Sequence, residues 1–350
     1  MPREARGLDA ELLDAAFAAV DEGVRSGELP SGVLAVARGD RTARLEAFGP
    51  VKTDSVFLLA SISKPIFATA VMRLVERGRM RLNDPVAKVI PEFACQGKED
   101  VRLWHLLTHT SGLDELSGLS LWGQADRAGL IAAAIQAPLR FRPGSQYGYC
   151  NASFFVMGEL IRRLTGRDDV TYLREGVLER LGMRDTSYQP PASPRVAPVH
   201  GSPWPRDPHF EYFSSLSWGA AGLWSTADDL VRFGQAFLGG GALDGQRVLA
   251  PATVRAMTTL QTGDMVETRA LGDGPAYYGL GFGKTGPDNA GGPSTELRTA
   301  EGFGHGGATG TALWVEPELD LVVVFLTNRW GLDAPHASRA VNAAIAAATT

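Results

Sequence analysis

Strand-like segments occur at both ends of this 350-residue chain, with a mainly helical stretch between them. Near the N-terminus, residues 32–37 and 43–48 are separated by the short turn Arg38-Gly39-Asp40, which predicts a hairpin. Near the C-terminus, residues 311–315 and 319–326 flank a second turn. Strands at both ends around a helical middle predict one antiparallel sheet made from the two termini.

Helical spacing of apolar residues accounts for most of the remaining chain. We expect helices over residues 9–25, 61–77, 103–107, 126–136, 153–165, 227–238 and 334–347. Gly166 is expected to end the helix over residues 153–165. Proline is dense over residues 189–208, which predicts a surface loop.

The fold class predicted from this order is α+β. Residues 1–75 and 225–350 are expected to form the sheet subdomain with its flanking helices. Residues 76–224 are expected to form an inserted, mainly helical subdomain. The two parts would make one catalytic unit, with the active site in the cleft between them.

The composition excludes several classes of protein. The chain is 44% hydrophobic and 21% charged, which is typical of a globular protein with a large core. Its net charge of −5 argues against a basic face for nucleic acid. The longest apolar run, residues 321–326, is too short to cross a bilayer, and the acidic N-terminal segment does not look like a secretory signal. Two cysteines cannot form a disulfide framework or a metal cluster alone. We therefore expect a cytoplasmic protein with no metal, cofactor, nucleic acid or membrane partner. The oligomeric state is left open.

Ser61-Ile62-Ser63-Lys64 stands at the start of a segment whose residues 65–72 have almost no polar face. A helix that is apolar all round is usually buried in the middle of a domain. Residues three apart share a helix face, so the Ser61 hydroxyl and the Lys64 ammonium can meet. The helix N-terminus adds N–H donors and positive potential that stabilise an alkoxide, so that serine can act as a nucleophile without histidine. The same residues could also be a capping serine beside a solvated lysine.

Two further short motifs combine groups that can do chemistry. Tyr149-Cys150-Asn151 offers a phenol for proton transfer and an amide for a substrate carbonyl, although Asn151 could simply cap the next helix. His305-Gly306-Gly307-Ala308 comes directly before the C-terminal hairpin. Its glycines would let a substrate approach backbone N–H groups closely, but a tight turn with a solvated histidine is the simpler reading.

Other candidate sites are weaker. Lys284-Thr285-Gly286 precedes a segment rich in glycine and proline, so we interpret it as part of a loop rather than as an edge strand. His105 and His109 are four residues apart, but no glutamate between them and no third ligand supports a zinc site. Cys150 is interpreted as a small core residue. The chain contains no Gly-x-Ser-x-Gly, which excludes the usual α/β-hydrolase nucleophile turn.

The three motifs occur in the order Ser61-x-x-Lys64, Tyr149-x-Asn151 and His305-Gly306-Gly307. In that order they resemble the motifs of the serine β-lactamase and penicillin-binding superfamily. The chain is most similar to its branch of class C β-lactamases, D-alanyl-D-alanine carboxypeptidases and family VIII esterases. Four further segments look like segments of this branch: residues 81–85 (RLNDP), 106–113 (LLTHTSGL), 221–230 (AGLWSTADDL) and 278–283 (YGLGFG). The resemblance covers residues 30–345.

The resemblance implies a role for each matching residue. Ser61 would be acylated, with Lys64 and Tyr149 sharing the proton transfers. Asn151 would orient the acyl group, and the N–H groups of Ser61 and Ala308 would form the oxyanion hole. His305, Gly306 and Gly307 would contact substrate. Because the third motif often begins with lysine, His305 puts recognition of a substrate carboxylate in doubt.

The function expected from the sequence is that of a serine hydrolase acting on carboxylic esters with short acyl chains, through a covalent acyl-enzyme on Ser61. A β-lactamase or D-Ala-D-Ala carboxypeptidase is the alternative, since the same acylation chemistry serves both. An acyltransferase comes third. From a different class, the chain could be a binding module without catalytic activity on the same scaffold. The presence of all three intact motifs argues against this alternative. No residue is identifiable as a dedicated base for deacylation.

Overall fold

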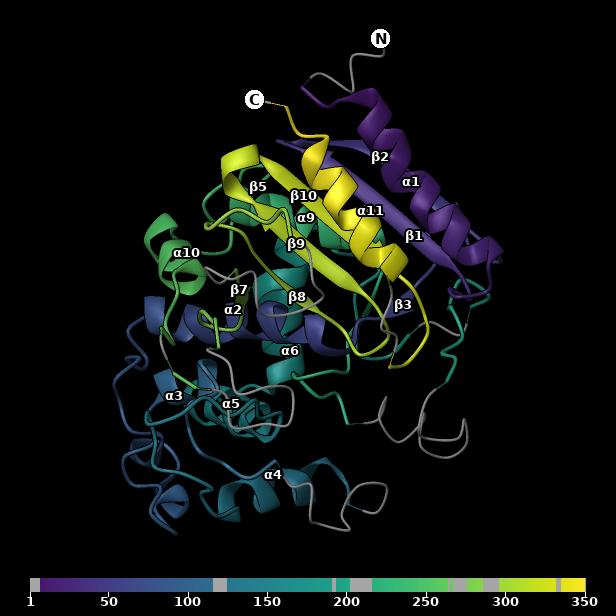
Figure 1. Ribbon diagram of the computed structural model, residues 1–350. Coiled ribbons are helices and arrows are strands. Elements are labelled where there is room, and N and C mark those ends of the chain that lie inside the picture. Colours follow the sequence, from purple (N-terminus) through teal and green to yellow (C-terminus); the bar gives the residue numbers. More distant parts are fainter. Residues whose placement is uncertain are drawn as a thin grey trace.

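The computed structural model describes residues 7–115, 125–190, 193–201, 216–263, 265–266, 276–285, 296–331 and 335–349. Among these residues, six strands form one antiparallel sheet in the order β2-β1-β10-β9-β8-β7. The strands are β1 (Gly32–Arg38), β2 (Arg41–Phe48), β7 (Gly283–Lys284), β8 (Phe303–Gly306), β9 (Ala312–Glu316) and β10 (Leu321–Leu326). N-terminal β1 pairs with C-terminal β10, so the purple and yellow strands lie side by side in Figure 1. The predicted sheet made from both termini is confirmed.

Helices from the two ends of the chain cover one face of this sheet. They are α1 (Ala10–Arg25) and α11 (Pro335–Ala346), which pack against each other across it (Figure 1). Leu34 and Val36 of β1 point to this face, because alternate residues of a strand face opposite sides. Asp9 caps α1 by accepting the N–H of Leu12 at 3.0 Å.

The opposite face packs on α9 (Ala227–Leu238), and it shares one buried core with α2 (Ser63–Glu76) and α5 (Ala152–Thr165). Residues Ser63 to Leu74 of α2 are all buried, as the apolar run predicted. The start of this helix differs from the prediction. A 3-10 turn, η2 (Ala60–Ile62), precedes α2, and it is this turn that carries Ser61.

Smaller elements connect these parts. The helices are α3 (Leu103–Leu107), α4 (Arg127–Gln136), α6 (Asp169–Leu173), α7 (Glu179–Leu181) and α10 (Pro251–Thr258), with a π-helical turn at Arg174–Leu178. Short 3-10 turns lie at Val86–Lys88, Pro91–Phe93 and Pro317–Leu319. Two small sheets pair β3 (Phe57–Leu58) with β4 (Trp224–Ser225) and β5 (Ala242–Leu243) with β6 (Gln246–Arg247). Gly166 ends α5 with φ of 69°, as predicted. Of the proline-rich segment 189–208, residues 191–192 and 202–208 lie outside the described residues.

The interpretation of Lys284 as a loop residue is wrong. Lys284 lies in β7, the edge strand of the main sheet, and pairs with Phe303 of β8. Its ammonium is buried and donates to the carbonyl oxygen of Glu301 at 3.0 Å. A strand of two residues has no periodicity of its own, so the surrounding glycines and prolines were the only signal available.

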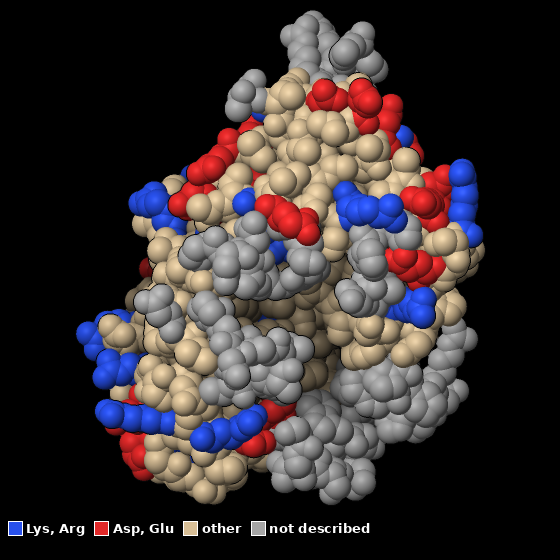
Figure 2. Space-filling model, in the orientation of Figure 1, with Lys and Arg blue, Asp and Glu red and all other residues tan. Residues whose placement is uncertain are grey.

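The surface carries both signs of charge. On the face shown in Figure 2, Lys and Arg side chains are interspersed with Asp and Glu side chains over the described part of the chain. None of the helices in the described ranges has the length and apolar character that crossing a membrane requires.

Candidate active site

Ser61 and Lys64 meet as the three-residue spacing predicted. The Lys64 Nζ donates to the Ser61 Oγ at 3.0 Å and to the carbonyl oxygen of Ala220 at 2.9 Å. Lys64 is fully buried, whereas Ser61 is partly exposed and therefore open to a substrate. Ala60 has φ of 47°, a left-handed conformation that is unusual for a residue other than glycine. Strain of this kind directly before a hydroxyl group is common at functional sites.

Tyr149 lies beside the same ammonium. The Lys64 Nζ is 4.6 Å from the centre of the Tyr149 ring, and it lies 5.5 Å from the Phe154 ring. The Tyr149 ring also stacks on the imidazole of His109, with 4.4 Å between ring centres. Hydroxyl, ammonium and phenol therefore come together from η2, α2 and the loop before α5.

Asn151 is next to this group, but it does not cap α5 through its side chain. Instead, both its backbone N–H (2.5 Å) and its side-chain Nδ2 donate to the carboxylate of Glu115. A carboxylate that accepts from the amide nitrogen fixes the orientation of the amide. Glu115 was not singled out from the sequence, because a contact across 36 positions leaves no local pattern.

His305 is held by hydrogen bonds at both ring nitrogens. The Nδ1 lies 2.7 Å from the carbonyl oxygen of Gly306, and the Nε2 lies 3.1 Å from the Tyr278 hydroxyl. A carbonyl can only accept, so Nδ1 carries the proton and the Tyr278 hydroxyl donates to Nε2. Burial, together with the charge of Lys64, lowers the pKa of His305 to about 3. The imidazole is thus neutral near pH 7. Like Glu115, Tyr278 was not predicted as a site residue. The sequence analysis included it only as part of the segment 278–283.

The turn after β8 is docked against the chain that leads to Ser61. Thr309 Oγ1 donates to the Leu58 carbonyl oxygen at 2.8 Å, and Thr311 Oγ1 donates to that of Leu59 at 3.1 Å. A Cβ on Gly307 would lie 2.3 Å from the Leu59 oxygen, so glycine is required for this approach. His305 and Gly306 are the last two residues of β8, and Ala308 is exposed at the turn.

Cys150 is buried between two of the site residues. Burial raises the pKa of its thiol to about 12, so the thiol stays protonated near neutral pH. A protonated thiol is a poor nucleophile, in keeping with its interpretation as a core residue.

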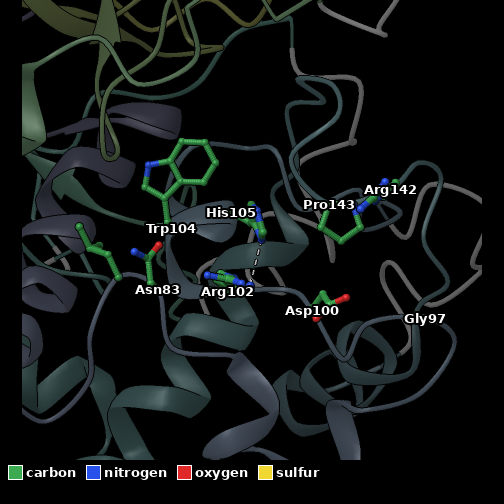
Figure 3. Close-up of a pocket in the computed structure, with 9 residues that line it drawn as sticks. Asn83, Gly97, Asp100, Arg102, Trp104, His105, Arg142 and Pro143 are labelled. Carbon is green, nitrogen blue, oxygen red and sulfur yellow. Dashed lines mark hydrogen bonds between the residues drawn. The ribbon is translucent and has the colours of Figure 1, made fainter.

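His105 and His109 do not form a metal site. His105 lines a separate surface pocket of about 740 Å³ with Asn83, Asp100, Arg102 and Arg142, among others (Figure 3). Its Nδ1 accepts the N–H of Arg102 at 3.0 Å, and burial lowers its pKa to about 4. Within the described ranges, no three His, Cys, Asp or Glu side chains are grouped as metal ligands.

Known proteins resemble this chain over most of its length. The family model described as "Beta-lactamase" matches residues 16–348. The chain is 33% identical to "Esterase EstB" of Burkholderia gladioli, over 92% of each chain. It is 32% identical to "Penicillin-binding protein 4" of Amycolatopsis lactamdurans, over 86% of this chain and 77% of the relative. Among solved structures, a penicillin-binding protein homologue from Caulobacter crescentus superposes with a TM-score of 0.78 at 26% identity, covering 97% of this chain and 99% of the other.

Proposed function

The chain belongs to the beta-lactamase family of serine hydrolases, and from this premise we propose that it cleaves carboxylic esters with short acyl chains through an acyl-enzyme on Ser61. The observation that carries the proposal is the 3.0 Å contact between the Ser61 hydroxyl and the buried Lys64 ammonium beside Tyr149. A serine next to a lysine and a tyrosine suits nucleophilic catalysis in which these two residues move the proton.

In the proposed reaction, one group of the Lys64–Tyr149 pair is deprotonated, as a lysine amine or a tyrosinate. The Ser61 Oγ attacks the ester carbonyl carbon and its proton passes to that group. The backbone N–H groups of Ser61 and Ala308 would stabilise the oxyanion, a contribution of about 3 kcal/mol for each donor. Collapse of the tetrahedral intermediate breaks the bond to the leaving alcohol, which takes up the proton. Water then attacks the acyl-Ser61 ester, releasing the carboxylic acid and restoring the hydroxyl.

An ester is favoured over a β-lactam or a D-Ala-D-Ala peptide because of the state of His305. Those substrates carry a carboxylate, and a neutral imidazole with both nitrogens hydrogen-bonded is a poor partner for an anion. The buried ammonium of Lys284 donates to the backbone carbonyl oxygen of Glu301. The name of the esterase relative from Burkholderia gladioli supports the same choice. The β-lactamase, carboxypeptidase and acyltransferase alternatives would use the same acyl-enzyme.

The test is a comparison of rates on p-nitrophenyl acetate, butyrate and octanoate with the rate on a chromogenic cephalosporin. We expect the short esters to be turned over fastest. Ser61→Ala should abolish turnover. Ser63→Ala is the matched control and should retain it, because Ser63 Oγ accepts the N–H of Leu223 instead of contacting Lys64. Preference for the cephalosporin would favour the β-lactamase alternative, and absence of turnover would favour a binding module.

A further inference from the structure

His109 lies in the turn after α3, in the centre of the aromatic residues that surround the site. It is completely buried and has φ of 58°. Few residue types other than glycine accept this left-handed conformation, and histidine and asparagine are enriched among them. The ring contacts Tyr147 and Tyr278 edge to face, with centres 5.9 and 4.9 Å away. These contacts hold the imidazole itself in place.

The backbone on both sides of Tyr149 is bonded to His109. The carbonyl oxygen of His109 accepts the N–H of Gly148 at 2.8 Å, and its Nδ1 accepts the N–H of Cys150 at 3.0 Å. An Nδ1 that accepts carries no proton, so the ring is in its neutral form with the proton on Nε2. His109 therefore holds the loop that carries the tyrosine.

The side chain of Tyr149 is supported by the same residue. Its ring lies face to face with the imidazole, at 4.4 Å between centres and 29° between planes. The stacking restricts the tilt of the phenol, and the two backbone hydrogen bonds restrict the position of its Cα. Together they restrict where the phenol can lie relative to Lys64.

We propose that His109 is a positioning residue for catalysis, which holds the Tyr149 phenol beside Lys64 through the stacked ring and the Nδ1–Cys150 hydrogen bond. The proposal rests on the proposed function of Tyr149 in proton transfer. His109 itself touches neither the substrate nor the reacting atoms in this role. Its effect should therefore be on kcat, because misplacing a proton-transfer group by about 1 Å costs on the order of 100-fold in rate.

Two variants separate the two contacts. His109→Asn keeps a residue type that tolerates the left-handed φ and a side-chain acceptor, but it removes the ring. His109→Phe keeps a ring that can stack on Tyr149, but it removes the Nδ1 acceptor and accepts the left-handed φ less readily, so its thermal midpoint is measured in parallel. Titration with an activated p-nitrophenyl phosphonate counts the Ser61 sites that react, so kcat is expressed per competent site even if part of a preparation is unfolded.

The expected result is a decrease of about 10- to 100-fold in kcat per titrated site for p-nitrophenyl butyrate in each variant, with KM changed less than about threefold. His105→Asn is the matched control, since His105 lies one turn earlier and lines the separate pocket, and it should keep the kcat of the wild type. Values of kcat per site within threefold of wild type in both variants, or a loss confined to KM, would overturn the positioning role. Failure of the phosphonate to label wild-type Ser61 would overturn the proposed function itself, and with it the role of His109.

Discussion

Replacing Gly307 by alanine tests whether the turn after β8 holds the N–H of Ala308 in its proposed place. Gly307 donates its own N–H to the carbonyl oxygen of Thr311 at 2.7 Å, which closes the turn. An added Cβ would lie 2.1 Å from Thr311 Oγ1 and 2.3 Å from the carbonyl oxygen of Leu59. The threonine hydroxyl can rotate away. The Leu59 oxygen belongs to the backbone two residues before Ser61, so there the turn itself must move.

The size of the effect follows from these distances. The Cβ would be about 1.1 Å closer to the Leu59 oxygen than the 3.4 Å at which ordinary van der Waals contact begins. The turn must therefore shift by about 1 Å relative to Ser61, and with it the N–H of Ala308. Loss of one oxyanion donor costs about 100- to 1,000-fold in kcat, or about 2.7–4 kcal/mol. We expect Gly307→Ala to lose kcat within this range.

The assay is steady-state hydrolysis of p-nitrophenyl butyrate, with the thermal midpoint measured in parallel. Gly283→Ala is the matched control, because a Cβ there meets its nearest atom, the Gly304 oxygen, at an ordinary 3.4 Å. It should keep the rate of the wild type. A kcat for folded Gly307→Ala within threefold of wild type would refute the assignment of this turn to the oxyanion hole.

Three other predictions follow from the site and its surroundings. Lys64→Ala and Tyr149→Phe should each lower kcat by about 100-fold or more, and the double variant should be little worse than the poorer single variant; additive losses would contradict a shared proton relay. His305→Lys should raise kcat/KM for a cephalosporin relative to a neutral ester by about tenfold, with a steeper dependence on salt, and an unchanged ratio would show that charge at this position does not select substrates. Burial raises the pKa of Asp229 to about 6. Between about pH 4 and 6, the folded chain therefore holds a proton that the unfolded chain releases. Binding of this proton stabilises the folded chain, and the stabilisation is lost as the pH rises from about 4 to 6. Asp229→Asn should therefore gain in thermal midpoint relative to wild type on going from pH 5 to pH 8, whereas a constant difference would contradict the raised pKa.

Much of the fold was predictable because its elements are long and regular. The buried strand β10 and the amphipathic helix α1 have clear patterns, and Asp9 and Gly166 end their helices by well-known local chemistry. The pattern of strands at both ends of the chain predicted that they share one sheet, but it did not predict the order of the strands. The edge strand β7 was missed, since two residues paired with β8 depend on a partner far along the chain.

The site was predictable where a short motif contains both partners. The spacing of Ser61 and Lys64 on one helical face is enough to bring their side chains together. Glu115 and Tyr278 could not be predicted in the same way, because their contacts with Asn151 and His305 span 36 and 27 positions. The contacts of such residues depend on the fold and cannot be inferred from the sequence around them.

The most direct test of the central claim is to locate the covalent label left by an activated p-nitrophenyl phosphonate. Trypsin should release residues 53–73 as one peptide, since Lys64 is followed by Pro65, and fragment masses then distinguish Ser61 from Ser55 and Ser63. If Ser61 is the nucleophile, one phosphonyl group should be found on Ser61, and esterase activity should be lost in proportion to labelling. A label on another residue, or full loss of activity without a label on this peptide, would contradict it.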